Sequence, residues 1–237
     1  FRLNFDSDRL RWVLGVYGAA ERNKAARQFL NGTTPLNGNN LRGEENNYAL
    51  FGELAYEFAP QWTVIAGGRV DYFESMTTGT TNNGLVFSPV FRNFSDTEFL
   101  PKLGVSYDIS DDQSLSFIYQ QGYRPGGSSV NLTTSQIVEF NAERTQNFEI
   151  GYRGTLMGGA MIVSANAFYQ IWDDQQVERA LVPGDPRTNV IQNAASSTSY
   201  GAELDVSYRF SPQTTAFASV GLVQTSFDDF VSFLGTP

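Results

Sequence analysis

The sequence contains neither cysteine nor histidine. Without cysteine, the chain has no disulfide framework and no thiolate metal site. Without histidine, it lacks the commonest general base, the commonest ligand of transition metals and any Ser-His or Cys-His nucleophile pair. We therefore expect no enzymatic activity, no cofactor and no metal site in this chain.

Two further features are missing: a long apolar run and an excess of basic residues. No stretch of about 18 apolar residues is present, so the sequence encodes no transmembrane helix. Lys and Arg total 16 against 25 Asp and Glu, which gives a net charge of −9. Because a nucleic-acid groove needs clustered basic residues, we expect no nucleic-acid partner.

Aromatic residues make up 14% of the sequence, and there are 22 glycines. Much of the apolar content therefore lies in Tyr and Phe, which favours strands over helix cores. Three stretches alternate between apolar and polar residues, as a strand with one apolar face does. Their apolar phases are Trp62, Val64, Ala66, Gly68, Val70 and Tyr72; Phe148, Ile150 and Tyr152; and Tyr200, Ala202, Leu204, Val206, Tyr208 and Phe210.

The connections between strands fall into two kinds. Further strands are expected at about 1–5, 9–20, 46–58, 98–109, 114–123, 160–172 and 213–224, although 9–20 and 213–224 alternate too poorly to assign their faces. Short turns are predicted at 6–8, 59–60, 110–113, 156–159 and 211–213, and long polar links near 21–45, 74–97, 124–141 and 173–196. This rhythm is typical of a barrel with tight turns at one rim and long loops at the other. The predicted fold class is an all-β, antiparallel, up-and-down transmembrane β-barrel.

The uncharged phase of the three clear strands is expected to face lipid. Tilted strands of about ten residues span a hydrocarbon layer, where only a closed sheet satisfies every backbone group. Aromatic residues near both strand ends predict two girdles at the headgroup level. The alternative is a β-sandwich, which would seal Val64, Val70, Leu204 and Val206 in its core. The opposite phase is predicted to face the lumen and holds Arg69, Asp71, Glu149, Arg153, Glu203 and Asp205.

Three segments resemble the barrel domain of TonB-dependent receptors. Residues 99–127, FLPKLGVSYDISDDQSLSFIYQQGYRPGG, are similar to the family's Pro-Lys strand, acidic turn and returning strand that ends in Gly-Tyr-Arg-Pro-Gly-Gly. Residues 142–179 resemble its Glu-x-Thr-x-Asn-x-Glu-x-Gly strand, glycine-containing turn and Phe-Tyr strand. Residues 193–212 resemble its Asn-Ala strand that continues into Tyr-Gly-x-Glu-Leu, and the three segments follow one another in the family's order.

The resemblance implies a barrel of about 22 strands in the bacterial outer membrane, occluded by an N-terminal plug. Residues 1–237 are then expected to be part of that barrel domain. They would supply about ten strands, without the plug, the N-terminal region that engages TonB and the C-terminal strands. The resemblance also implies contact with outer-membrane lipid and active uptake of a scarce large solute, foremost a ferric siderophore, energised through TonB.

The long links are expected to form an outer vestibule that recognises the solute. For Arg124, which precedes Pro125, two roles stay open: contact with an anionic ligand, or anchoring to neighbouring loop carboxylates. Two other functional classes also stay open, a passive porin or structural barrel and a soluble β-rich binding module. The candidate ligand contacts are Phe91, Arg92, Arg124, Trp172, Arg179 and Arg187.

Overall fold

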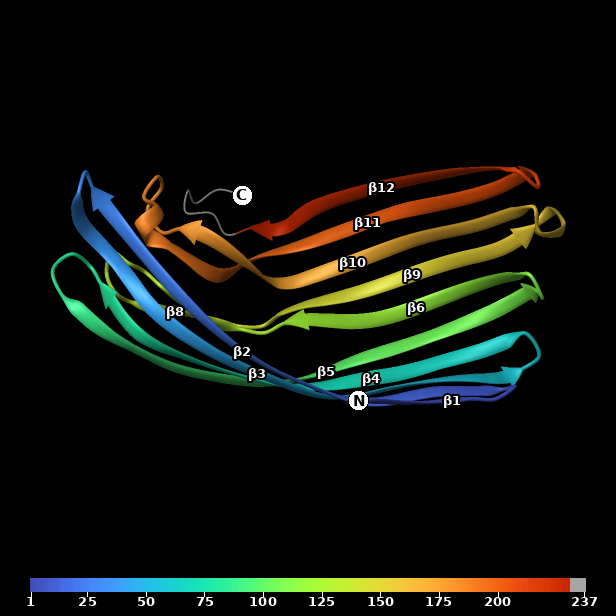
Figure 1. The fold of residues 1–237 in the computed structure, drawn as a ribbon, viewed down its shortest axis with the longest axis horizontal. Helices are drawn as coiled ribbons and strands as arrows, with labels where there is room; N and C mark the ends of the chain where they lie inside the picture. The colour runs from blue at the N-terminus through green and yellow to red at the C-terminus, as the bar shows by residue number, and fades with distance from the viewer. Residues whose placement is uncertain (231–237) are drawn as a thin grey trace.

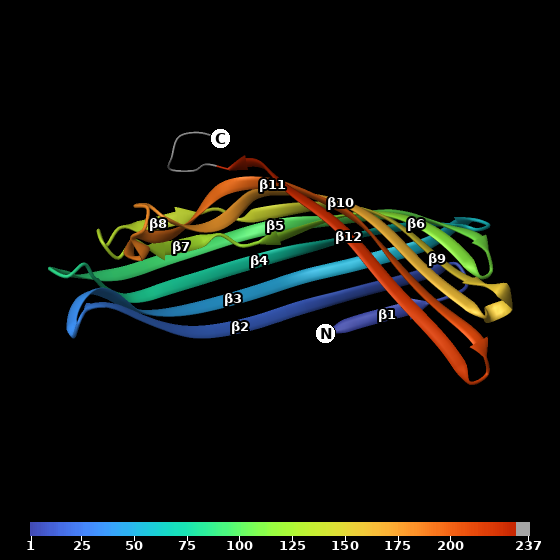
Figure 2. The same ribbon diagram turned by 90° about the horizontal axis from the view of Figure 1, so that it is seen from above.

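The computed structural model describes residues 1–230, which form one curved antiparallel sheet of ten strands and a separate two-stranded hairpin (Figures 1 and 2). Strands that follow one another in the chain are neighbours in the sheet, except that β7 and β8 lie between β6 and β9 in sequence and pair only with each other. This order confirms the predicted all-β, up-and-down barrel wall. The strands are β1 (Arg2–Asp6), β2 (Leu10–Asn31), β3 (Thr34–Ala59), β4 (Trp62–Asn82), β5 (Phe87–Ser110), β6 (Gln113–Arg124), β7 (Gly127–Val130), β8 (Ile137–Phe140), β9 (Glu143–Leu156), β10 (Met161–Ala180), β11 (Asn189–Ser211) and β12 (Thr214–Phe230).

Helical structure within residues 1–230 is confined to two short 3-10 turns, η1 (Met157–Gly159) and η2 (Pro186–Thr188). In this part of the chain no helix has the length and apolar character needed to cross a membrane. The turn at η1 places Gly158 and Gly159 at φ 61° and 88°. Glycine adopts such conformations without the steric cost of a Cβ, so the chain reverses tightly there.

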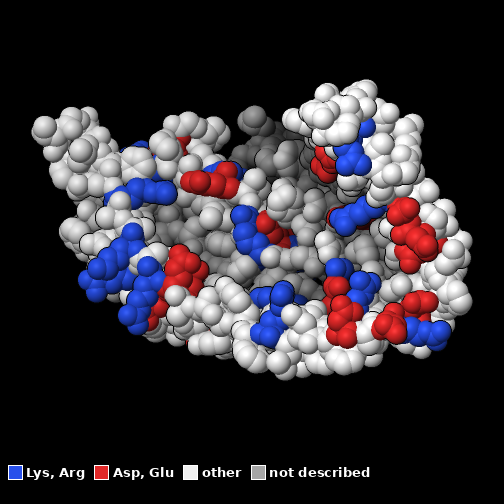
Figure 3. Space-filling view, turned by 45° about the vertical axis from the view of Figure 1, so that its right-hand side comes forward, with Lys and Arg blue, Asp and Glu red and all other residues white. Residues whose placement is uncertain are grey.

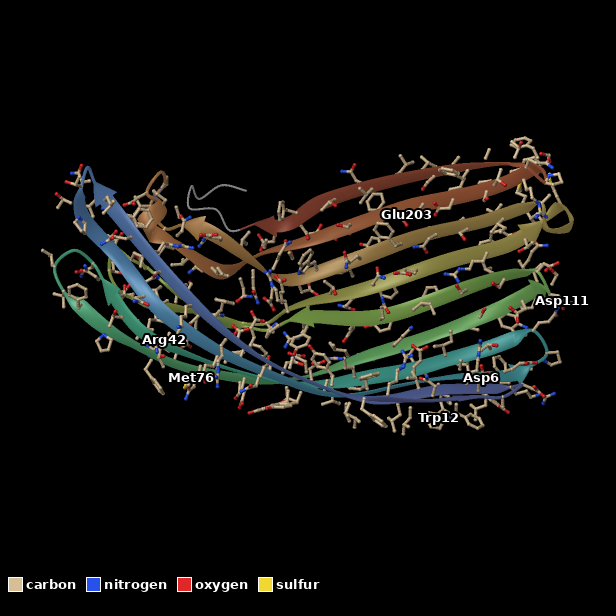
Figure 4. The ribbon with its side chains drawn as sticks, in the orientation of Figure 1. Asp6, Trp12, Arg42, Met76, Asp111 and Glu203 are labelled. Carbon is tan, nitrogen blue, oxygen red and sulfur yellow. The ribbon has the colours of Figure 1, made fainter. Side chains whose placement is uncertain are left out.

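The strand register places the three predicted apolar phases, of 62–72, 148–152 and 200–210, on one face of the sheet. Residues directly opposite one another in neighbouring strands form continuous cross-strand rows, which are the unit of sheet stabilisation. Trp12 projects from the convex side of the sheet in Figure 4, so the apolar face is the outer one. One row runs through Phe5, Trp12, Leu54, Ala66, Leu103, Tyr119, Phe148, Tyr169 and Tyr200.

The apolar phase predicted to meet lipid is exposed on this outer face. Val64 and Leu204 are 38% and 40% exposed, and Val70 is similarly open. Val206 shares the face, because it lies opposite Val163 and Ala218. A sandwich core would have sealed these side chains, so the prediction of an outward apolar belt is confirmed.

The register also assigns the faces of the two strands that alternate poorly. In β2, Trp12 lies opposite Leu54 and therefore belongs to the outer face. In β12, Leu222 lies opposite Ala202 on the outer face of β11. Glycines and alanines interrupt both strands, which explains why the sequence pattern alone was weak there.

Two predicted long links, 21–45 and 74–97, are wrong. β2 and β3 stay paired up to Asn31 and Thr34, and β4 and β5 up to Asn82 and Phe87. Above the aromatic rings both faces of these hairpins carry mostly polar residues, so the two-residue alternation disappears. The link predicted at 173–196 shrinks for the same reason to residues 181–188. The five predicted short turns all lie where the structure has turns.

Candidate functional site: the inner face and the inserted hairpin

The sheet splits above the membrane part, at the seam between β5 and β6. Pairing of these strands ends at Lys102 and Gln120, although β5 continues alongside β4 as far as Phe87. Asp108 donates its N–H to Gln61 on the β4 side, so by alternation Pro101 faces β6. Proline has no N–H to donate, and the ladder between β5 and β6 therefore stops there.

A hairpin fills the space above this seam. We call residues 125–142, which include β7 and β8, the inserted hairpin; in Figure 2 it lies between the left-hand ends of β5 and β11. Phe94 on the inner phase of β5 lies so close that a Cβ on Gly126 would be 2.9 Å from its ring. Asn131, Leu132 and Ala142 are among the most buried residues of the chain. The inserted hairpin is thus a packed part of the wall and not an open loop.

A buried carboxylate fastens the base of the inserted hairpin to β10. Glu143 is almost fully buried, and its Oε1 lies 2.8 Å from Nε of Arg124. Its Oε2 accepts a 2.6 Å hydrogen bond from the N–H of Gln176. The side chain of Gln176 in turn donates to the carbonyls of Pro125 and Asn141, at 2.9 and 3.0 Å. Gln176 reaches these carbonyls because the register of β10 shifts just before it.

The tip of the inserted hairpin is hydrogen-bonded to two parts of the wall, β11 on one side and β3 on the other. Toward β11, the hydroxyl of Ser129 accepts a 3.0 Å hydrogen bond from the N–H of Ile191, and Leu132 donates its N–H to the carbonyl of Arg187 at 3.1 Å. Toward β3, the side-chain amide of Asn37 donates to the carbonyl of Leu132 at 3.3 Å. The inserted hairpin therefore bridges two parts of the wall that are distant in the sheet.

Below the inserted hairpin lies a cavity of about 560 Å³ on the inner face. Arg69 donates hydrogen bonds from Nε and, at 2.7 Å, from Nη2 to the carboxylate of Asp71, which is 1% exposed. The guanidinium also lies 5.2 Å from the ring centre of Tyr17, within reach of a cation–π contact. Tyr123 lines the same cavity. A carboxylate, a guanidinium and the phenols of Tyr17 and Tyr123 thus line a space able to hold a small polar ligand.

Glu98 and Arg144 close the seam from the side. Arg144 of β9 donates two hydrogen bonds to the carboxylate of Glu98 on β5, one from Nη2 and one from Nε at 3.3 Å. This bidentate contact crosses the gap that β6 leaves open above Gln120. Glu98 lies opposite Asp71 in the register of β4 and β5, and Arg144 directly follows Glu143, so polar groups are found from the cavity to the base of the inserted hairpin.

A second hollow, of about 460 Å³, lies lower on the inner face. Figure 3 shows acidic and basic residues interspersed over the surface of the chain around the hollow. The six residues predicted to face the lumen all line these cavities. Arg69 and Asp71 line the upper one, and the lower one is lined by Glu149, Arg153, Glu203 and Asp205.

The six candidate ligand contacts are not brought together. Arg124 contacts Glu143, which is the loop-anchoring role that the sequence left open. Arg92 lies 3.8 Å from Glu139, and Arg179 donates a 2.9 Å hydrogen bond to Gln192.

Two of the candidates, Trp172 and Phe91, are aromatic, and they lie in different surroundings. Nε1 of Trp172 is buried without a hydrogen-bond partner in residues 1–230. Phe91 was expected in the vestibule, but it lies opposite Thr78 on the outer phase of β5, so this placement is wrong. Because β5 alternates without slip from Phe99, every second residue up to Phe91 faces outward.

The sixth candidate, Arg187, belongs to the tight turn at η2. Its Nε and Nη2 each lie 2.7 Å from a carboxylate oxygen of Asp185, which also accepts the backbone N–H of Arg187. These contacts lower the pKa of Asp185, chiefly through the side-chain hydrogen bonds from Arg187. Arg187 therefore has a structural partner in this turn.

Several residues of the upper site were not predicted from the sequence. Glu143, Gln176 and Tyr17 carry no local motif, since their contacts join strands that are far apart in the chain. Tyr123 shares the phase of the outward Tyr119, yet it lines the inner cavity because β6 leaves β5 above Gln120. The proline at position 101 was a visible signal for that departure.

Comparison with known proteins supports the resemblance to the barrel domain of TonB-dependent receptors that the sequence showed. The family model of the TonB dependent receptor-like β-barrel matches residues 1–237. The pesticin receptor of Yersinia pestis is 24% identical over 211 residues, which cover 87% of this chain and 30% of that protein. The ferripyoverdine receptor of Pseudomonas aeruginosa is 24% identical over 118 residues, or 48% of this chain and 14% of that protein.

Solved structures show the same wall. The ferric yersiniabactin uptake receptor of Yersinia pestis superposes with a TM-score of 0.84 at 21% identity, covering 97% of this chain and 35% of that one. The ferripyoverdine receptor bound to ferripyoverdine gives a TM-score of 0.68 at 17% identity, covering 98% and 32%. The chain thus belongs to the β-barrel domain of TonB-dependent receptors, proteins of the bacterial outer membrane. It spans about a third of the length of the relatives it matches.

Proposed function

We propose that this chain is part of the wall of a receptor that takes up a ferric siderophore, with energy delivered through TonB. The observation that carries the proposal is the inserted hairpin, which is packed across the inner face above the cavity of Arg69, Asp71 and Tyr123. Porins enclose a water-filled channel, whereas other outer-membrane barrels are plugged by loops, and ligand sites are concave with a few fixed polar groups. The names of the relatives, receptors for ferripyoverdine and for ferric yersiniabactin, support iron chelates as the solute class.

The chemistry of the upper cavity suits such a solute. Ferric siderophores present oxygen-rich, often anionic surfaces, which guanidinium groups and phenols recognise by hydrogen bonds. Arg69 and Tyr123 would offer these donors, and Asp71 would hold Arg69 in place. We assign no chemical step to this wall: its role is to bind the solute and let it pass. The contact with TonB would belong to the N-terminal region of the whole receptor.

The experiment is uptake of radiolabelled iron by a strain that lacks the full-length gene, supplied with a panel of ferric siderophores. We expect the mutant to lose uptake of at least one siderophore and the intact gene to restore it. Uptake should also stop when TonB is deleted or the proton-motive force is collapsed. Wild-type uptake of every siderophore by the mutant would contradict the proposal, and uptake that persists without TonB would indicate a passive porin.

A variant pair connects uptake to the cavity. Replacing Arg69 by Gln removes a charged donor, whose hydrogen bond to a ligand contributes about 1.5 kcal/mol, or about tenfold in affinity. We therefore expect the Arg69→Gln receptor to need about ten times more siderophore for half-maximal uptake. Arg153→Gln changes the same charge in the lower hollow and should leave this concentration unchanged. Equal behaviour of the two variants would contradict a role for the upper cavity.

A further inference from the structure

The upper cavity on the inner face is lined by more acidic than basic groups. Its carboxylates are those of Glu21, Glu45 and Asp71, and its guanidinium is that of Arg69. Asp71 is already neutralised by Arg69 through two hydrogen bonds. No ion pair within residues 1–230 includes Glu21 or Glu45. The cavity therefore keeps two negative charges without a counter-charge.

The strand register brings these two charges together. Glu21 of β2 lies directly opposite Glu45 of β3, and both are on the inward phase that Tyr17 shares. Arg22 follows Glu21 but has the opposite phase, and it lies 3.4 Å from Glu44 on the outer face. Like charges directly opposite one another destabilise a sheet, so a cation bound between the two glutamates would stabilise this part of the wall.

The other basic residues of the upper inner face do not supply this cation. Arg92 and Arg144 each contact a carboxylate of their own. Arg27 is on the inward phase but six residues above Glu21, which is about 20 Å along an extended strand. A cation that balances the two glutamates therefore comes from outside the described wall.

A second observation points to a hydrogen-bond donor in the same place. Asn47, two residues below Glu45 on the inward phase of β3, also lines the cavity. Its Oδ1 atom is buried and has no hydrogen-bond partner in residues 1–230. A buried acceptor without a donor costs free energy, which a donor from the solute would recover. An ammonium group has three donors and no acceptor, and it matches two carboxylates and an amide oxygen.

The distance between the glutamates and the Arg69–Asp71 pair indicates the shape of the solute. Glu45 lies opposite Ser75, four residues beyond Asp71 in β4, which is about 13 Å along an extended strand. A small cation does not reach both places. A solute that contacts Arg69 with its oxygen-rich centre reaches the glutamates only if its positive charge lies on an arm.

We propose that the solute of the upper cavity is a ferric chelate with a free ammonium group on an arm, and that Glu21 and Glu45 bind this group. The inference rests on the proposed uptake of a ferric siderophore and adds the charge of its arm. Arg69 and Tyr123 contact the oxygen-rich centre of the chelate, and the two glutamates contact the ammonium group. A cleft lined by negative charge also raises the local concentration of a cationic solute.

The test measures binding and uptake of three probes by the full-length receptor: a ferric trihydroxamate with a terminal ammonium group, the same chelate after acetylation of that group, and a trianionic ferric tricatecholate. A hydrogen bond between charged groups contributes about tenfold in affinity, so the ammonium form should bind about tenfold more tightly than the acetylated form. In the double variant Glu21→Gln, Glu45→Gln this preference should disappear, while the affinity for the acetylated chelate stays unchanged. Glu44→Gln is the matched control, because Glu44 precedes Glu45 on the outward phase, and it should keep the preference.

The conservative double variant Glu21→Asp, Glu45→Asp keeps both charges and should retain the preference for the ammonium form. The inference is overturned if the acetylated chelate or the tricatecholate binds as tightly as the ammonium form, or if none of the three probes is taken up. It is also overturned if the Gln double variant binds both trihydroxamates equally more weakly, because the glutamates would then hold another part of the receptor. Uptake of any neutral or anionic ferric siderophore in these cases would leave the proposed function standing, whereas uptake of no ferric siderophore at all would end both.

Discussion

The carboxylate of Glu143 and the guanidinium of Arg124, 2.8 Å apart, join the two ends of the inserted hairpin. Glu143 is the residue directly after the hairpin, and Arg124 is the residue directly before it. The side chain of Glu143 is 4% exposed, whereas that of Arg124 is 56% exposed. The arrangement resembles a clasp, in which a buried acid fixes the point where the chain leaves the sheet and returns to it.

Removing the basic half of this clasp should loosen the inserted hairpin. In Arg124→Gln, Glu143 keeps the N–H of Gln176 but loses its ion pair, at a cost of about 1–2 kcal/mol because Arg124 is half exposed. Amide hydrogen exchange of residues 125–142 in the full-length receptor should become about 5- to 30-fold faster. Arg92→Gln breaks an exposed contact of 3.8 Å to Glu139 and should change exchange little. Equal acceleration in both variants would show that the clasp has no special role.

A methyl group at Gly126 should also displace the inserted hairpin. A Cβ there would lie 2.5 Å from the carbonyl oxygen of Phe140 and 2.9 Å from the ring of Phe94. Relief of this overlap costs about 1–3 kcal/mol, and Gly126→Ala should speed thermolysin cleavage within residues 128–138. Gly18→Ala is the control, since its nearest neighbour is an ordinary 3.7 Å contact with Tyr48. Unchanged cleavage of the Gly126 variant would contradict the close packing.

The two faces of β11 should respond differently to the same arginine. Leu204 belongs to the lipid-facing belt, while Glu203 lines the lower hollow. An arginine facing lipid costs about 2–4 kcal/mol at mid-membrane, so Leu204→Arg should lower the urea midpoint of the receptor in lipid vesicles. Glu203→Arg, one residue away, should shift the midpoint far less. Equal shifts would mean that the assignment of outer and inner faces is incorrect.

The stability of the turn at η2 should depend on pH through the ionisation of Asp185. Its pKa is lowered in the folded chain by Arg187, so the stability it contributes is present above the unfolded carboxyl pKa. That stability is lost as the pH falls through the lowered value. The N–H of Thr188, bonded to the carbonyl of Asp185 at 3.0 Å, should therefore exchange faster below about pH 4 than intrinsic rates explain. Asp185→Asn should remove this pH dependence. If the exchange of Thr188 in the variant keeps the same pH profile, a group other than Asp185 causes it.

Much of the membrane part of the fold could be predicted from the sequence. Val64 to Val70 alternates because one face meets lipid and the other meets polar groups, and that contrast leaves a two-residue pattern. The same strand loses the pattern above Tyr72, where polar residues stand on both faces although the inner-phase Phe73 and Thr81 are buried. Residues 74–82 were therefore predicted to be a loop although they continue the ladder. The sequence reports the environment of a strand more directly than its pairing.

The candidate site was less predictable, because its contacts join distant strands. Asn37 and Leu132 are 95 residues apart, and no local sequence pattern predicts their hydrogen bond. The contact of Glu143 with Gln176 depends on a register shift in β10 that propensities do not encode. Arg124 was more accessible to sequence analysis, since its position beside Pro125 and near acidic residues left an anchoring role open.

The proline-terminated seam between β5 and β6 has a consequence for how such receptors diversify. Below Lys102 and Gln120 each strand is bonded to its neighbour, so an insertion there would shift the register of many side chains. Above that point the β2–β5 strands and the β6–β9 segment are connected mainly by side chains, and either can change length without disturbing the other. The hairpins of the upper part can thus be exchanged as whole units, while the membrane ladder beneath keeps its geometry.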